Sequence, residues 1–132
     1  MKRGAITIKN AHSMSIQVTI ELSEDGTVWM TKNEIASLFD VYRSSVAANL
    51  KSIFKSGGLF EKEVKKDIPQ TLDNGQKCIV EYFNLEVILA LCYRMNSPIC
   101  TLFRQWVAKQ VSVPCKKQSP IIVHLGTATT IS

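Results

Sequence analysis

The residues of this chain with the clearest chemical potential are three cations in a stretch without acids. Between Asp40 and Glu61 the sequence contains Arg43, Lys51 and Lys55 and no carboxylate. An arginine can donate two hydrogen bonds to the edge of a guanine, and a lysine can neutralise a phosphate. This combination is typical of a surface that binds nucleic acid.

Short side chains accompany these cations and could complete such a surface. Ser44 can reach a phosphate or a base, and Ala47 or Ala48 can touch a thymine methyl group. Lys51 and Lys55 are better suited to phosphates. The candidate DNA-binding residues are Thr31, Tyr42, Arg43, Ser44, Ala47, Ala48, Lys51 and Lys55.

Two short helices joined by a sharp turn would position these side chains. Thr31 can cap a helix, and Glu34, three residues later, completes a capping box. A break is expected at residues 40–42, and a second helical pattern follows over residues 43–55. A helix-turn-helix needs a compact helix, a turn and a second helix whose outer face enters the major groove. The pattern predicts this motif over residues 31–54.

Two residues depart from the usual pattern of such a motif. Asp40 stands where the turn prefers glycine, and Asn49 stands where an apolar residue is common. The alternative is an ordinary pair of amphipathic helices, with Val46 and Leu50 in the core and the cations merely solvated. Periodicity alone leaves both interpretations open.

Alternating polar and apolar residues predict strands near the N-terminus. Residues 6–8 and 15–22 have this period, and residues 27–30 form a third short strand-like segment. Because residues 23–26 read as a turn, we expect residues 15–22 and 27–30 to pair as a hairpin.

A second hairpin is expected around Asn74-Gly75, with strands over residues 64–70 and 76–83. Pro69 places the first strand at an edge or a bulge. The hairpin could act as a wing beside the recognition helix or remain a plain sheet edge, because Asp67, Asp73 and Glu81 offset its lysines. The candidate wing residues are Lys65, Lys66, Asn74, Gly75 and Lys77.

Two further helices are predicted after this hairpin. Asn84 can cap a strongly apolar helix over residues 85–95, which should be the central buried helix. Ser97-Pro98 can start another, with apolar residues at helical spacing up to Val107. Arg94, Arg104 and Trp106 could serve a partner surface; the favoured alternative is that Trp106 is core and the arginines bridge helices to the sheet.

These elements predict an α+β fold: a helix-turn-helix with a small antiparallel sheet and hairpin, winged-helix-like, followed by two packed helices. Residues 1–112 would form the single DNA-binding domain. Residues 113–132 read as a flexible tail or the remnant of a truncation or frameshift. With no secretion signal and no apolar run of about 20 residues, a cytoplasmic protein is expected.

The same composition argues against other classes of function. The net charge of +5 comes from the chain ends, because residues 21–104 hold ten basic and eleven acidic side chains. Cys78, Cys92, Cys100 and Cys115 include no CxxC pair, so we expect core packing and neither metal nor cofactor. With no nucleophile beside a base and no facing carboxylates, the chain does not read as an enzyme.

Six short motifs follow one another along the chain, at residues 27–31, 34–39, 74–75, 81–85, 93–94 and 103–106. In this order they resemble the N-terminal domain of RhuM-family virulence proteins, which are similar in turn to phage antirepressor modules of the KilA-N and Bro-N kind. The resemblance covers roughly residues 15–111 and implies a DNA-binding, helix-turn-helix-like module, with no catalytic residues to carry over.

The function expected from the sequence is therefore sequence-specific binding of double-stranded DNA, as a transcriptional regulator or an antirepressor-like module from a phage or mobile element. The alternative is a protein-interaction module that dimerises or binds a partner without DNA. Whether the chain forms a homodimer stays open at this point.

The composition of the last twenty residues generates a first prediction. Deleting residues 113–132 should leave the cooperative unfolding transition intact, because no capped and periodic element lies in that span. Thermal melts of the whole and shortened chains measure this. Loss of a cooperative transition in the shortened chain would show that residues 121–125 contribute a structural strand.

Overall fold

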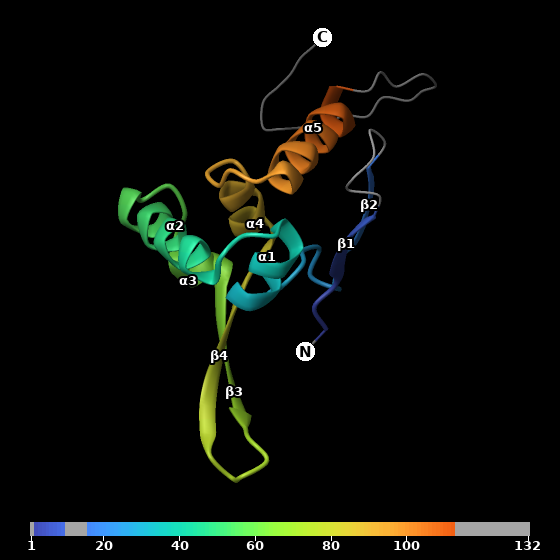
Figure 1. Cartoon of the computed structure of the whole chain (residues 1–132). Helices are drawn as coiled ribbons and strands as arrows, with labels where there is room; N and C mark the ends of the chain where they lie inside the picture. The colour runs from blue at the N-terminus through green and yellow to red at the C-terminus, as the bar shows by residue number, and fades with distance from the viewer. Residues whose placement is uncertain (1, 10–15, 113–132) are drawn as a thin grey trace.

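The computed structural model describes residues 2–9 and 16–112, which form two small antiparallel sheets and five helices (Figure 1). The α+β class is confirmed. One sheet pairs β1 (Ala5–Lys9) with β2 (Gln17–Glu21), and the other pairs β3 (Lys65–Thr71) with β4 (Lys77–Phe83). The helices are α1 (Lys32–Phe39), α2 (Arg43–Ser56), α3 (Glu61–Val64), α4 (Leu85–Cys92) and α5 (Pro98–Ser112).

Helix α4 is the centre of the hydrophobic core, as its composition predicts. Val87, Ile88 and Leu91 have no solvent exposure. The Asn84 side chain caps the helix by accepting a hydrogen bond from the Val87 backbone N–H at 3.3 Å. The helix was expected to reach residue 95 but ends at Cys92. The chain turns there, and the N–H groups of Arg94 and Met95 both bond to the Leu91 carbonyl.

Helix α5 packs against α4 and begins as predicted. The Ser97 side chain accepts a hydrogen bond from the Cys100 N–H at 3.0 Å and donates one to the Phe39 carbonyl at 2.7 Å. Phe103 is fully buried, meets the Phe39 ring edge-on at 5.4 Å and stacks on Trp106 at 5.9 Å. One serine therefore fixes the start of α5 against the end of α1.

The two arginines near the C-terminal helices bridge helix to helix, and the expectation that they reach the sheet is wrong. Arg104 Nη1 donates to the carbonyls of Cys92 and Met95 at 2.7 and 3.1 Å, which satisfies the end of α4. Arg94 Nη1 donates to Ser52 Oγ on α2 at 3.1 Å. Both arginines find acceptors near the end of α4: Ser52 on α2 for Arg94, and the carbonyls of Cys92 and Met95 for Arg104.

The N-terminal hairpin differs from the expected pairing. β2 pairs with the preceding strand β1, with Ile6 opposite Ile20. Residues 27–30 form no strand: the successive side chains of Val28 and Trp29 are both buried, which a half-solvated strand does not allow. Instead the Trp29 N–H donates to the Arg3 carbonyl at 2.8 Å, and Met30 forms an isolated bridge with Phe83. The alternation of polar and apolar residues predicted the positions of the β1 and β2 strands but not which strand pairs with which.

The hairpin β3–β4 is confirmed and projects from the body as an arm (Figure 1). Its loop has three residues, because Leu72 N–H donates to the Gln76 carbonyl at 2.7 Å and Gly75 N–H to the Leu72 carbonyl at 2.9 Å. Gly75 has a φ of 85° and Asn74 does not have a positive φ, so this is a longer loop with a glycine bulge and not a two-residue turn.

Two of the described cysteines are residues of the hydrophobic core. Cys92 and Cys100 are fully buried, and Cys78 is half-buried on the arm, while Cys115 lies outside the described residues. Burial, together with nearby Cys100, raises the pKa of the Cys92 thiol to about 12, against the opposing effect of Arg104. Cys92 therefore stays protonated and unreactive at neutral pH.

The double role of Ser97 generates the second prediction. Ser97→Ala should lower the free energy of unfolding by roughly 1–3 kcal/mol, because it removes a helix cap and leaves the buried Phe39 carbonyl without its donor. Denaturant titration of both proteins measures the difference. Ser112→Ala, at the exposed end of α5, is the matched control and should change stability by less than about 0.5 kcal/mol. Equal effects would contradict the role assigned to Ser97.

Candidate nucleic-acid interface

The two predicted helices and the turn between them are present, and local hydrogen bonds fix their geometry. Thr31 caps α1 by accepting from the Glu34 N–H at 3.2 Å, and the Glu34 side chain accepts from the Thr31 N–H at 2.9 Å. Thr31 is half-buried and its side-chain oxygen is occupied by this bond, so capping is the role that the structure shows for it.

The two residues that depart from the usual motif are accommodated. Asp40 adopts a left-handed conformation (φ 55°, ψ 54°), which aspartate tolerates better than most residues, and it ends α1. Val41 follows, half-buried, with its N–H bonded to the Ala36 carbonyl at 3.0 Å. Asn49 satisfies its own polarity, because its Nδ2 donates to the Ser45 carbonyl at 2.9 Å. Neither residue disturbs the turn.

Helix α2 has one buried side and one exposed stripe. Its buried side consists of Val46, Leu50 and Ile53. The exposed stripe follows i, i+4, i+7, i+11 spacing, so its members stand one above another. The stripe consists of Ser44, Ala48, Lys51 and Lys55.

The expectation that these residues face outward holds for all but one position. Tyr42 is 81% exposed and Arg43 is exposed beside it at the start of the helix. Ala47 is half-buried, because it sits between the exposed stripe and the root of the arm. Only part of the Ala47 methyl group is therefore accessible to a ligand such as a thymine base.

The start of α2 is open as well as exposed. Tyr42 occupies the N-cap position without a side-chain hydrogen bond, and the first turn carries no acid. Free N–H groups at a helix start favour an anion, and the first turn here includes Arg43. Within residues 2–9 and 16–112, none of Arg43, Lys51 and Lys55 has an ion-pair partner. Their charges are available to a ligand.

A groove of about 480 Å³ separates α2 from the root of the arm. Ala47, Ala48 and Lys51 line its helix side, while Lys65 and Glu81 line its arm side. Small residues on the helix side keep the groove open. The groove has charges of both signs, whereas the outer stripe is free of acids.

Lys65, a candidate wing residue, is surrounded by carboxylates of its own chain. Its Nζ lies 2.9 Å from Glu81, 3.2 Å from Glu61 and 3.6 Å from Asp67. The hydrogen bond with Glu81, opposed by burial and assisted by Glu61, raises the lysine pKa above its ordinary value. Three carboxylates already neutralise this charge, so Lys65 is no candidate for phosphate.

The remaining wing residues divide between two locations. Lys66 points to the other face of the arm, where its Nζ lies 4.4 Å from the centre of the Trp29 ring and 3.5 Å from Asp25. Asn74, Gly75 and Lys77 are exposed at the tip. The structure therefore does not gather the five wing candidates into one basic patch.

Three other cations lie close to this region and were not among the DNA-binding candidates taken from the sequence. Arg94 reaches α2 through Ser52, Lys32 lines the groove while paired with Glu81 at 3.3 Å, and Lys62 is exposed on α3. Arg94 is 42 residues from Ser52 in sequence, so no local spacing could have placed it there.

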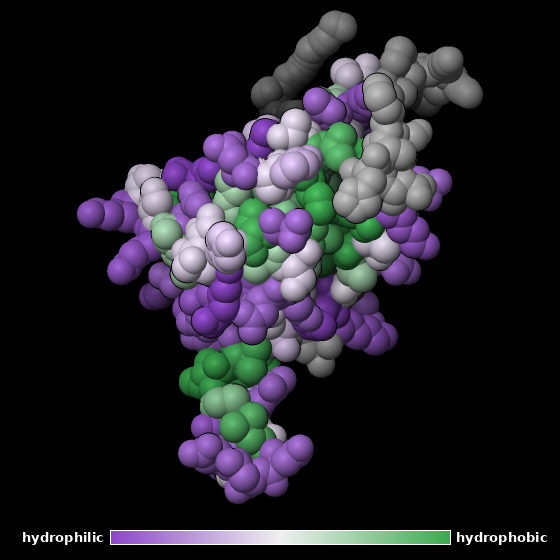
Figure 2. Space-filling model, viewed as in Figure 1, coloured by the Kyte–Doolittle hydropathy of each residue, from purple (hydrophilic) through white to green (hydrophobic). Residues whose placement is uncertain are grey.

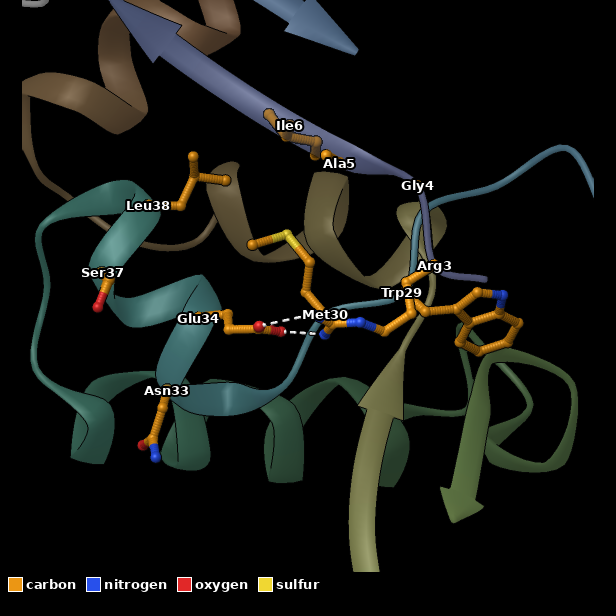
Figure 3. Close-up of a pocket in the computed structure, with 10 residues that line it drawn as sticks. All are labelled: Arg3, Gly4, Ala5, Ile6, Trp29, Met30, Asn33, Glu34, Ser37 and Leu38. Carbon is orange, nitrogen blue, oxygen red and sulfur yellow. Dashed lines mark hydrogen bonds and ion pairs between the residues drawn. The ribbon is translucent and has the colours of Figure 1, made fainter. Parts of the chain in front are cut away.

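A second hollow, of about 500 Å³, lies between β1 and α1 on the N-terminal side (Figure 3). Its charged groups are directed at each other: Arg3 donates to both oxygens of Glu34, with the longer contact 3.0 Å. Apolar side chains of Ile6, Met30 and Leu38 form the remaining wall. Among the described residues that line this hollow, the charged ones are Arg3 and Glu34, and they are paired with each other.

Within the described part of the chain, no three His, Cys, Asp or Glu side chains are grouped to hold a metal ion. No helix there is both long enough and apolar enough to cross a membrane. No protein-family model matches the chain, and neither the curated proteins nor the solved structures gave a significant match. The site must therefore be interpreted from its own geometry.

The Arg3–Glu34 pair generates the third prediction. Burial opposes ionisation of Glu34, but hydrogen bonds from Arg3 and from the Thr31 backbone outweigh it and lower its pKa below the ordinary 4.5. A carboxyl group with a lowered pKa stabilises the folded state above its unfolded pKa, and this contribution is lost as the pH falls through the folded value. The melting temperature should therefore decrease as the pH is lowered past about 4.5. This decrease should be less steep in the Glu34→Gln variant than in the wild type.

Thermal melts from pH 7 to pH 2 measure this difference. Glu86→Gln is the matched control, because Glu86 is exposed and makes no ion pair among the described side chains. Its acid transition should follow that of the wild type. If Glu34→Gln and Glu86→Gln gave the same profile, the ion pair would contribute nothing to acid sensitivity.

Proposed function

We propose that this protein binds double-stranded DNA in a sequence-dependent way, with α1 and α2 acting as a helix-turn-helix. Helix α2 would enter the major groove at its N-terminal end. Arg43 would contact a base edge there, and Lys51 and Lys55 would contact phosphates further along.

The observation that carries this proposal is the exposed stripe on α2. It combines an open helix start, two small residues and unpaired cations on the face opposite to the core. A helix that served only to pack would not need an outer face without acids along its whole length of 14 residues. A major groove about 12 Å wide admits a helix whose outer side chains are short, such as Ser44 and Ala48.

The motif order that resembles RhuM-family N-terminal domains supports the same function. A hairpin that follows the second helix in the chain, as the arm follows α2 and α3, is also a feature of winged helices, and this likeness in order is a second support. The charges modify this second point. Because Lys65 is neutralised and the tip carries Asp73 beside Lys77, base and phosphate contacts are assigned to α2, and the arm is left out of the DNA interface.

Replacing two α2 cations separately generates the fourth prediction. Arg43→Ala should flatten sequence preference, because a bidentate arginine–guanine contact contributes about 1–3 kcal/mol of discrimination. Lys55→Ala, three turns along, should weaken binding to all duplexes alike and reduce the salt slope by about 1. Binding isotherms on a selected site and on a scrambled duplex, at several salt concentrations, measure both effects.

The control for charge is Lys109→Ala, which removes one exposed cation from α5 and should leave sequence preference unchanged. If Arg43→Ala and Lys55→Ala lost the same affinity on both duplexes, α2 would bind only as a basic patch. Unchanged binding in both variants would instead favour a protein-interaction module.

A further inference from the structure

We propose that the outer edge of β4, together with a hollow at its root, binds the free C-terminal end of a partner protein. The partner's last residues would lie along β4 as a short parallel strand, with their terminal carboxylate beside Arg43. The peptide site does not depend on DNA binding, although Arg43 would serve in both.

The backbone of β4 has free hydrogen-bonding groups on the side away from β3. In an antiparallel pair, successive residues direct their N–H and C=O groups alternately toward the partner strand and away from it. Leu72 bonds to Gln76 across the hairpin, so the even-numbered residues of β4 face β3 and the odd-numbered ones face outward. No backbone bond from the described part of the chain reaches the outward groups of Lys77 and Ile79. Such groups can bind an extended peptide as an added strand.

The opposite edge of the arm is less suited to an added strand. Pro69 lies opposite Ile79 and has the same outward orientation on β3. Because proline has no N–H, the outward row of donors on β3 is interrupted at its middle. The added strand is therefore assigned to β4.

The slot along β4 is closed at the root of the arm. Phe83 also faces outward, but its N–H and C=O bond to Met30 at 2.8 and 3.0 Å. Thr31 follows Met30 and caps α1, so the protein's own chain occupies the slot there. A bound strand cannot continue past this point, and a chain end therefore fits the slot better than an internal segment does.

A hollow of about 310 Å³ lies where the slot ends. Ile79 and Val80 line its strand side, while Asn33 and Arg43 line the side formed by the starts of α1 and α2. Asn33 and Arg43 are both exposed. A guanidinium fork and a carboxamide can donate hydrogen bonds to the same carboxylate.

The charge of this hollow determines which end of a peptide it accepts. Glu81 also lines the hollow, but Lys32 and Lys65 already pair with it at 3.3 and 2.9 Å. Arg43 has no ion-pair partner among the described side chains, so its charge is left uncompensated. A C-terminal carboxylate is attracted there, whereas an N-terminal ammonium group is repelled. Since β4 runs from the tip of the arm to its root, a peptide that ends at the root with its carboxylate runs parallel to β4 (Figure 1).

The side chains of the arm indicate an apolar partner. Ile79 is 64% exposed, and Figure 2 shows an apolar band on the projecting arm, between the polar body and the polar tip. Cys78 and Val80 point to the other face of the hairpin and are half-buried. Apolar or β-branched residues on the added strand would cover apolar surface on both faces. The expected ligand is a chain end with such residues before a free carboxylate.

Fluorescence anisotropy without nucleic acid tests the proposal. The probe is a six-residue peptide of alternating threonine and valine, labelled with fluorescein at its N-terminus and ending in a free carboxylate. The matched control is the same peptide with a C-terminal amide, which should bind about tenfold more weakly because it carries no charge for Arg43. Equal affinities, or no binding of the free-acid peptide up to about 1 mM, would overturn the proposal.

A charge variant tests the position of the carboxylate. Arg43→Ala should weaken binding of the free-acid peptide about tenfold and leave binding of the amide unchanged, because the two changes remove the same contact. Lys109→Ala removes an exposed cation from α5 and should change neither affinity. Equal losses for both peptides in Arg43→Ala would contradict the assigned contact.

Two proline variants test strand addition, with circular dichroism to confirm that each is folded. Ile79→Pro removes an outward N–H from β4 without removing a bond to β3, and should raise the dissociation constant of the free-acid peptide about tenfold. Thr71→Pro removes an outward N–H from β3 and should leave it unchanged. Unchanged binding in Ile79→Pro, or equal effects of the two variants, would exclude strand addition on β4.

Discussion

The burial of α4 is the constraint on which the rest of the structure depends. Val87, Ile88, Leu91 and Cys92 are inaccessible to solvent, so other elements must cover the helix on several sides. Helices α2 and α5 both pack against it, and their buried residues Leu50, Ile53 and Phe103 belong to the same core cluster. Because α2 uses its apolar side for this contact, its opposite side must face solvent. The exposed stripe is thus a consequence of how the core is filled.

Polar contacts then fix the angles that hydrophobic packing leaves free. Ser97 ties the start of α5 to the end of α1, and Arg104 closes the carbonyl end of α4. Arg94 holds α2 through Ser52. The backbone groups at helix ends have no partners within the helix. The contacts of Ser97 and Arg104 supply partners for them from neighbouring helices and so join these helices at their ends. Helix α2 is joined to the root of the arm by the stacking of Phe54 on Phe83, whose ring centres lie 6.3 Å apart.

Local signals in the sequence predicted the elements well and their partners poorly. The capping box at Thr31, the Asn84 cap and the Ser97 cap each involve residues close in sequence, so each could be predicted and each is confirmed. The pairing of β2 with β1 could not be predicted, because two strands with the same alternation compete for one partner. The short helix α3 has too few residues to show a period. At the site, the exposed stripe followed from periodicity. The neutralisation of Lys65 did not, since Glu81 is 16 positions away in sequence.

The central claim is that the stripe on α2 reads DNA sequence. Selection of bound duplexes from a random pool, followed by titration of the recovered site at increasing salt, tests it most directly. The account predicts enrichment of a defined motif and an affinity that falls steeply as salt rises, because phosphate contacts release counterions. Recovery of no motif, together with an affinity for duplex DNA that does not change with salt, would contradict it.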